Sequence, residues 1–406
     1  MSGRRACYQC LLEEIRSIHV SHLKGIGAGV VSDIAASSVV SVEEQEKVTL
    51  RMIERAIGAS RDNLFLEMLC ESLFDWNKSL LMRLRGHGIE TFLMRKDSMT
   101  LFNYFSSHQR SLDACNLAAK LALSDSDMDI SERIHYFTLA VTSITAMGVE
   151  DDHSGRVIEL QDRLIIAEFQ RAAYNALNAE LEAINSANAN YDAQQRRGID
   201  ALANLVKSLR YRLKSISELY LEVTEPYKLW DLSLQLLFAA KSEDYSLVVR
   251  LWRSLIYRIV PDRSDVFEVG LFIQAKRSSQ VIDIDVRKQR NDVLYENYST
   301  WLNDMIEKVI SVGKAVRGGE SEIAFPTEVI VEELEEIILQ LHMLDIPLER
   351  NLASHAFLRI GLNHERILAA YMSILKRWEA RNAQAVVSLA QGACGTLVDW
   401  IGRSSG

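Results

Sequence analysis

The chain has 406 residues, a net charge of −9 and a hydrophobic content of 48%. The excess of acidic residues, with no basic block carrying interleaved aromatic residues, argues against nucleic acid as the main partner. No apolar run reaches the roughly 18 residues that a membrane-spanning helix needs, and the N-terminal residues lack the apolar core of a signal peptide.

Cysteine and proline usage narrow the class of protein further. An odd number of cysteines, 5 in a long chain, fits reduced thiols in the cytosol or nucleus rather than a disulfide framework. Only 4 prolines over this length permit long helices. The chain is long enough to bury a large core and too long for one compact helical bundle.

The N-terminal part is predicted to consist of helices separated by turns. The first helix is expected at about Arg4–Val20, and residues 23–41, rich in Gly, Ser and other small residues, are expected to form a flexible loop. This loop contains the run 25–29 with three glycines, but a phosphate-binding glycine loop needs a strand before it and a helix directly after it. We therefore interpret the run as a loop and not as a nucleotide site.

Helical patterning resumes at Ser41 with a capping signature, and short amphipathic helices continue to the polar loop that begins at Gly148. Two long helices are then expected at about 157–183 and 194–223, joined by a link rich in Asn and Ser. Both exceed the average length of globular helices. We predict that the region 157–223 forms the longest antiparallel helix pair of the fold.

Residues 227–262 are predicted to form a helical hairpin that is apolar on two sides. In its second helix one apolar row contains Val248, Leu251, Leu255 and Ile259, and a second row contains Trp252 and Ile256. A helix that is apolar on two sides is buried on two sides. The hairpin therefore needs helical neighbours before and after it, which is the arrangement of a stacked helical array.

The C-terminal part continues the pattern. Helices are expected at about 264–282, 283–316, from 327 onward, at 349–360, 363–378 and 383–401. The chain shows no convincing strand, and its hairpins recur without a fixed period. We therefore predict an all-α fold, an irregular elongated α-helical solenoid of stacked antiparallel helix pairs, with residues 1–406 forming a single solenoid.

Residues that could carry chemistry lack the patterns that chemistry requires. Cys7 and Cys10 have the spacing of redox and zinc sites, but no further ligands stand at suitable spacing, so they are expected to behave as small apolar residues. Histidines are scattered, and paired carboxylates such as Asp151 and Asp152 lie in polar loops. We predict no catalytic residue, no metal and no cofactor, and hence no enzyme.

Several stretches, taken in order, carry a resemblance to a known family. They are Arg5–Cys10, Asn63–Phe65, Leu73–Trp76, Leu117–Ala122, Ile130–Ile134, Glu225–Trp230, Val249–Trp252, Phe325–Pro326 and Asp345–Arg350. Together they resemble the C-terminal α-helical region of the large non-repeat scaffold nucleoporins of the inner pore ring. That family includes the vertebrate nucleoporin of one hundred and fifty-five kilodaltons and the yeast nucleoporins of one hundred and fifty-seven and one hundred and seventy.

The resemblance implies a structural role rather than catalysis. It implies a C-terminal fragment of a larger chain, located at the nuclear pore complex of the nuclear envelope. There it would serve as an inner-ring adaptor that supports nucleocytoplasmic transport of protein and mRNA. The implied partners are other inner-ring nucleoporins and a short linear motif of a flexible linker nucleoporin with glycine-leucine-phenylalanine-glycine repeats. No direct membrane contact by this region is expected, and without a heptad seam the chain is expected to be a monomer.

The candidate peptide-binding residues follow from surface logic alone. They lie on helices with enough apolar residues to form both a buried face and an exposed apolar patch. The five candidates are Leu247, Leu251, Tyr257, Val329 and Ile330. The alternative interpretation is that all five are ordinary core residues. Two other functions also remain open: an α-solenoid subunit of a vesicle-coat or tethering complex, and an enzyme with an unfamiliar helical fold.

Overall fold

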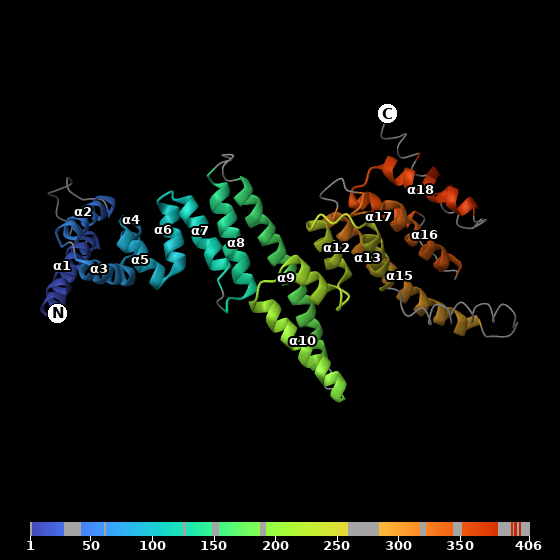
Figure 1. Ribbon diagram of the computed structural model, residues 1–406, viewed down its shortest axis with the longest axis horizontal. Coiled ribbons are helices and arrows are strands. Elements are labelled where there is room, and N and C mark those ends of the chain that lie inside the picture. Colours follow the sequence, from blue (N-terminus) through green and yellow to red (C-terminus); the bar gives the residue numbers. More distant parts are fainter. Residues whose placement is uncertain are drawn as a thin grey trace. The chain divides into compact units, whose positions relative to one another are not determined.

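Helices make up all the regular structure in the described part of the chain. The computed structural model describes residues 2–27, 42–60, 62–124, 127–147, 154–186, 192–258, 284–316, 322–343 and 351–380, with a few positions between 391 and 398. No strand occurs among these residues, and none of their helices is long and apolar enough to cross a membrane. The prediction of an all-α fold is confirmed (Figure 1).

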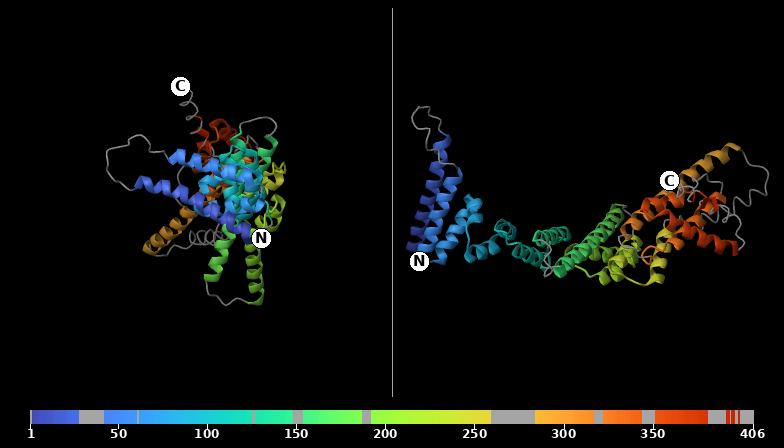
Figure 2. Two further views of the ribbon diagram at one scale, coloured as in Figure 1. Left: turned by 90° about the vertical axis from the view of Figure 1, so that its left-hand side faces the viewer. Right: turned by 90° about the horizontal axis from the view of Figure 1, so that it is seen from above.

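The chain divides into two compact units, residues 1–165 and 166–406. The first unit contains α1 (Ser2–Gly27), α2 (Val42–Ser60), α3 (Asn63–Trp76), α4 (Lys78–Arg83), α5 (His87–Lys96), α6 (Ser98–Ser107), α7 (Ser111–Ala122), α8 (Ile130–Thr145) and the start of α9 (Ser154–Ser186). Each helix from α1 to α8 packs on neighbours close in sequence, as α1 and α2 do in Figure 2. This is the stacking expected of a solenoid.

Four of the short helices of the first unit begin at side-chain caps. In each of these helices the capping side chain accepts a hydrogen bond from a backbone N–H in the first turn. The caps are Asp62 for α3, Asn77 for α4, Asp97 for α6 and Asp129 for α8. α7 and α8 then pack closely because Ala114, Ala118 and Ala122 on α7 are fully buried. The starts of α3, α4, α6 and α8 are therefore specified locally, by capping residues in the sequence.

The second unit contains the rest of α9 and α10 (Ala193–Tyr211), α11 (Ile216–Glu218), the π-helix η2 (Leu219–Thr224), α12 (Trp230–Ala239), α13 (Tyr245–Arg258), α15 (Ile284–Val316), α16 (Thr327–Met343), α17 (Leu352–Ile360) and α18 (His364–Ala380). Its main core joins α12, α13, α15, α16, α17 and α18. A smaller core joins α9, α10, η2 and α12. The single continuous solenoid expected from the sequence stays a prediction.

Several expected boundaries differ from the observed ones. α1 continues to Gly27, into the residues expected to form a loop, and residues 28–41 lie outside the described part. The helix expected at 194–223 ends at Tyr211, and a new start follows at Ser215, whose side chain forms a capping box with Glu218. The expected helix at 264–282 also lies outside the described residues.

The break after α10 is stabilised by one buried side chain. Gln170 of α9 has an exposed fraction of 0%, and its Nε2 donates to the carbonyl oxygens of Leu209 at 2.6 Å and Arg212 at 2.7 Å. Its Oε1 accepts from the backbone N–H of Lys214 at 2.9 Å. Gln170 thus satisfies backbone groups at the point where the helical hydrogen-bond ladder ends.

A second buried polar contact lies between α16 and α18. The Tyr371 hydroxyl donates to Glu335 Oε1, and both side chains are buried, with the thiol of Cys394 close by. Burial raises the pKa of Glu335, although the hydrogen bond from Tyr371 opposes this shift. Burial and the nearby carboxyl hold the pKa of Tyr371 well above its usual value, so the hydroxyl keeps its proton.

We expect Glu335→Gln to stabilise the protein above neutral pH, by on the order of 1 kcal/mol. Because the pKa of Glu335 is higher folded than unfolded, its contribution to stability is complete below the unfolded pKa of about 4.3 and is lost as pH rises through the folded pKa. Urea midpoints at pH 5 and pH 8 measure this. Glu336→Gln, on the exposed side of the same helix, is the control. An unchanged pH slope in Glu335→Gln would contradict the assignment.

Candidate functional site

The structure places the five candidate peptide-binding residues at different depths. Leu251 and Ile330 have exposed fractions of 0% and belong to the main core of the second unit. Leu247 is half-buried and packs against that core, and Val329 is half-buried on α16. Tyr257 belongs to α13, but its side chain lies outside the described part. Leu247 and Val329 are therefore the two described candidates that a partner reaches without repacking the core.

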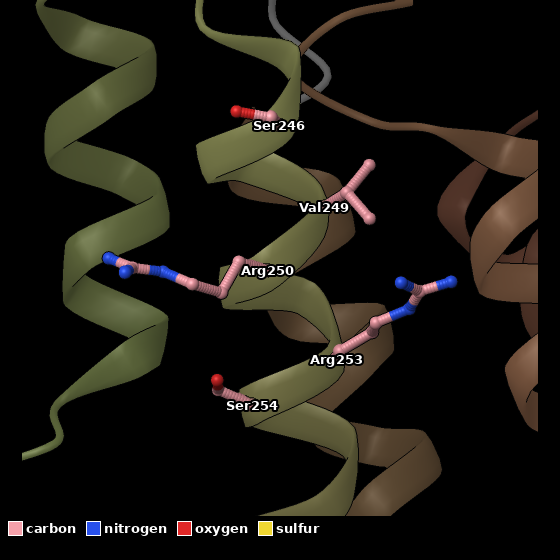
Figure 3. Close-up of a pocket in the computed structure, with 5 residues that line it drawn as sticks. All are labelled: Ser246, Val249, Arg250, Arg253 and Ser254. Atoms are coloured by element: carbon pink, nitrogen blue, oxygen red, sulfur yellow. The ribbon is translucent and has the colours of Figure 1, made fainter.

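The outer face of α13 carries a shallow depression. The inner face of α13 is formed by five buried residues: Val248, Leu251, Trp252, Leu255 and Ile256. The two apolar rows lie next to each other and form one side of the helix, so the prediction that α13 is apolar on two sides is wrong. The residues between them in the sequence form a strip on the other side. The depression has a volume of about 330 Å³ and is lined by Ser246, Val249, Arg250, Arg253 and Ser254 (Figure 3).

Two arginines of this strip are held by glutamates of neighbouring elements. Arg250 Nη2 lies 2.9 Å from Oε1 of Glu225, which directly follows η2, and Arg253 Nε lies 2.7 Å from Oε1 of Glu333 on α16. Figure 3 shows the two guanidinium groups pointing to opposite sides of α13. The side chain of Glu333 is 10% exposed and that of Arg253 is 53% exposed, so the guanidinium covers the carboxylate.

The N-terminus of α13 is closed by Asp244. Its Oδ1 accepts from the backbone N–H of Leu247 at 3.0 Å and from the Ser246 hydroxyl at 2.7 Å. The hydrogen bond from the Leu247 backbone lowers the pKa of Asp244 most, and the bond from the Ser246 hydroxyl lowers it further. A carboxylate here also suits the positive end of the helix dipole. The strip therefore has a negative group at its start and two guanidinium groups further along.

Groups that could perform chemistry are dispersed. Among the described residues, no three His, Cys, Asp or Glu side chains are grouped so that they could hold a metal ion. Cys7 and Cys10 are exposed on α1 rather than buried as small apolar residues, so that expectation is wrong. Burial raises the pKa of the Cys70 thiol to about 12, which keeps this thiol protonated and unreactive.

Comparison with known families shows which protein family this helical chain belongs to. The model of a family described as non-repetitive/WGA-negative nucleoporin C-terminal matches residues 1–405. The chain belongs to this family. Its members are nucleoporins, so the predicted location at the nuclear pore complex is confirmed. The family is structural, which confirms the prediction that the chain is not an enzyme and favours a pore scaffold over a vesicle-coat subunit.

Individual relatives agree with the family. The nucleoporin chain is 26% identical over 167 residues to the nuclear pore complex protein Nup154 of Drosophila melanogaster. The match covers 39% of this chain and 11% of Nup154, so the chain corresponds to a small part of that relative's length.

Solved structures of a fungal nucleoporin share the fold. The Chaetomium thermophilum Nup170 CTD–Nup145N complex has a TM-score of 0.67 and 15% sequence identity, covering 99% of this chain and 72% of that one. The Nup170 SOL structure from the same organism has a TM-score of 0.62 and 15% identity, covering 98% of this chain and 53% of that one. These likenesses confirm the helical solenoid fold of this nucleoporin.

Sequence reasoning missed the polar strip of α13 because it searched that helix for spare apolar residues. The usable signal was the spacing of Ser246, Arg250 and Arg253, which recur every three or four residues, with Ser254 four residues after Arg250; such spacing marks one helix face. That spacing indicates a solvent-facing strip. It does not reveal that the glutamates at 225 and 333, distant in sequence, hold the two arginines in place.

Proposed function

We propose that this nucleoporin chain is an adaptor of the inner ring of the nuclear pore complex that binds a short segment of a flexible linker nucleoporin. The observation that carries the proposal is the likeness of its fold to a domain solved together with a second nucleoporin. A stack of helices offers long surfaces between neighbouring elements, and an extended peptide buries a few apolar side chains there. Support for nucleocytoplasmic transport follows from such a role.

The binding surface in this proposal lies over α13 and α16 of the second unit. Leu247 and Val329 supply half-buried apolar contacts, and Val249 lines the depression on the same side of α13 as Arg253. Leu251 and Ile330 support this surface from below, because both are fully buried. We propose no contact role for the linker's glycine-leucine-phenylalanine-glycine repeats, since the segment that binds is one short motif.

The proposal is tested by calorimetric titration of the 406-residue chain with overlapping peptides tiled across the unstructured region of the linker nucleoporin. We expect one peptide to bind with a Kd on the order of 1 μM and a negative heat-capacity change, the marker of apolar burial. Leu247→Ala combined with Val329→Ala should weaken binding by about tenfold, because each truncation removes an apolar contact.

Leu112→Ala is the matched control, since Leu112 is an exposed leucine, 40% accessible, on α7 of the first unit. Its affinity should equal that of the unmodified chain. The adaptor proposal fails if no peptide binds while circular dichroism shows the chain folded. The location over α13 and α16 fails if a peptide binds and the double variant leaves its affinity unchanged.

A further inference from the structure

We propose that the α13 strip selects peptides with two acidic side chains, one for each side of the helix, and an apolar residue next to one of them. The two acidic groups bind Arg250 and Arg253, and the apolar residue occupies the depression lined by Val249. This inference rests on the proposed function, because it names the chemistry of the segment that the adaptor binds. It is carried by the position, pairing and exposure of the two arginines.

The two guanidinium groups are positioned before any partner arrives. Glu225 bonds Arg250 from one side of α13, and Glu333 bonds Arg253 from the other. An arginine that is already held in one geometry loses less side-chain entropy when it binds a second carboxylate. A guanidinium has five N–H donors in a planar fork, so pairing with one glutamate does not exhaust its capacity.

In each of the two pairs the arginine is more exposed than its glutamate. The side chain of Arg250 is 60% exposed and that of Glu225 is 37% exposed. The side chain of Arg253 is 53% exposed and that of Glu333 is 10% exposed. An approaching group therefore touches guanidinium rather than carboxylate at Arg253, whereas at Arg250 it meets a guanidinium that is more exposed than its glutamate. The whole chain carries a net charge of −9, so long-range attraction does not explain a preference for acids here. The preference is local and rests on direct hydrogen bonds.

The geometry also sets the order of groups in the ligand. Because the guanidinium groups point to opposite sides of α13, one carboxylate does not bond both (Figure 3). Val249 lies with them in the lining of the depression and supplies its apolar contact. A peptide crossing α13 meets Arg250 on one side of the helix, and Arg253 together with Val249 on the other side (Figure 3). Asp244 closes the N-terminal end of the strip and repels an acidic group placed there.

The test is a double-mutant cycle on the tightest peptide from the tiled set, titrated into the full chain. Replacing each acidic residue of that peptide with its amide should weaken binding by about tenfold per residue, and Arg250→Gln or Arg253→Gln in the chain should do the same. In Arg253→Gln the matching amide replacement should change Kd by less than about twofold, since the interaction is already absent.

Controls separate this chemistry from a loss of folding. Arg253→Gln leaves the buried Glu333 without the contact at 2.7 Å, so the variant Arg253→Gln/Glu333→Gln is measured beside it and should bind equally weakly. Arg359→Gln is the matched control, because Arg359 pairs with Glu307 on an exposed surface of the same unit. Its affinity should not change.

The outcomes distinguish the two proposals. If a peptide binds over α13 and α16 but tolerates amide replacement and both arginine variants, the acidic selectivity is wrong and the adaptor function stands. If no peptide binds, both proposals fall. If short nucleic acid binds more tightly than any peptide and Arg250→Gln abolishes that binding, the strip recognises phosphate and the peptide selectivity is wrong.

Discussion

Gln170→Leu is expected to destabilise the second unit by about 3 kcal/mol, because it leaves three backbone groups without their hydrogen-bond partner. Those groups are the carbonyls of Leu209 and Arg212 and the N–H of Lys214. Hydrogen exchange gives a local readout, since the Lys214 amide should lose its protection. Urea denaturation followed by circular dichroism gives the change in unfolding free energy.

Gln161→Leu is the matched control, because Gln161 is an exposed glutamine on the same helix, α9. Its stability should change by less than about 0.5 kcal/mol. Gln170→Glu provides a second check on mechanism. A carboxylate accepts from Lys214 but donates to neither carbonyl, so this variant should be no more stable than Gln170→Leu. A stable Gln170→Glu variant would show that the donated hydrogen bonds are not what holds the break in place.

Trp252→Ala is expected to cost about 4 kcal/mol of unfolding free energy, the typical result of removing a large buried aromatic side chain. Trp252 is fully buried, packs edge-on against Phe325 with ring centroids 5.2 Å apart, and donates from Nε1 to the carbonyl oxygen of Ala324 at 3.1 Å. It therefore links α13 to the segment that leads into α16. Urea denaturation of the full chain measures the loss.

Trp252→Phe separates packing from hydrogen bonding. It keeps an aromatic ring but leaves the Ala324 carbonyl unpaired, so we expect a loss of about 1–2 kcal/mol. Tyr245→Ala is the control, because Tyr245 is an aromatic residue of the same helix with an exposed fraction of 48%. If Trp252→Ala and Tyr245→Ala have equal effects, the contact between Trp252 and Phe325 is not central to this core.

The fold could be predicted from the sequence where its causes are local. Helical spacing predicts the two apolar rows of α13, and their five described residues are all buried, with exposed fractions of 3% or less, while Ile259 lies outside the described residues. The helical hairpin predicted within residues 227–262 is observed as α12 and α13, and Asp244 caps its second helix. Both signals lie within a few residues of the structure they determine.

The rest depends on contacts that no local pattern displays. The helix expected at 194–223 ends early because Gln170, about 40 residues upstream, bonds the end of α10. The exposed residues of the second unit are even harder to predict from the sequence. Apolar spacing identified Leu251 and Ile330 as members of apolar helix faces, but whether such a face is covered depends on which helices pack against it. The pairs that fix Arg250 and Arg253 likewise form only in the folded chain.

The packing of the first unit has a consequence for how the chain is made. From α1 to α8, the contacts between elements join helices that are close neighbours in sequence, whereas in the second unit α12 packs against α15 and α13 against α16. Low contact order favours rapid folding, because little loop-closure entropy opposes each contact. We expect the hairpins of the first unit to form one after another as they leave the ribosome. The main core of the second unit must wait until α15 and α16 have been synthesised.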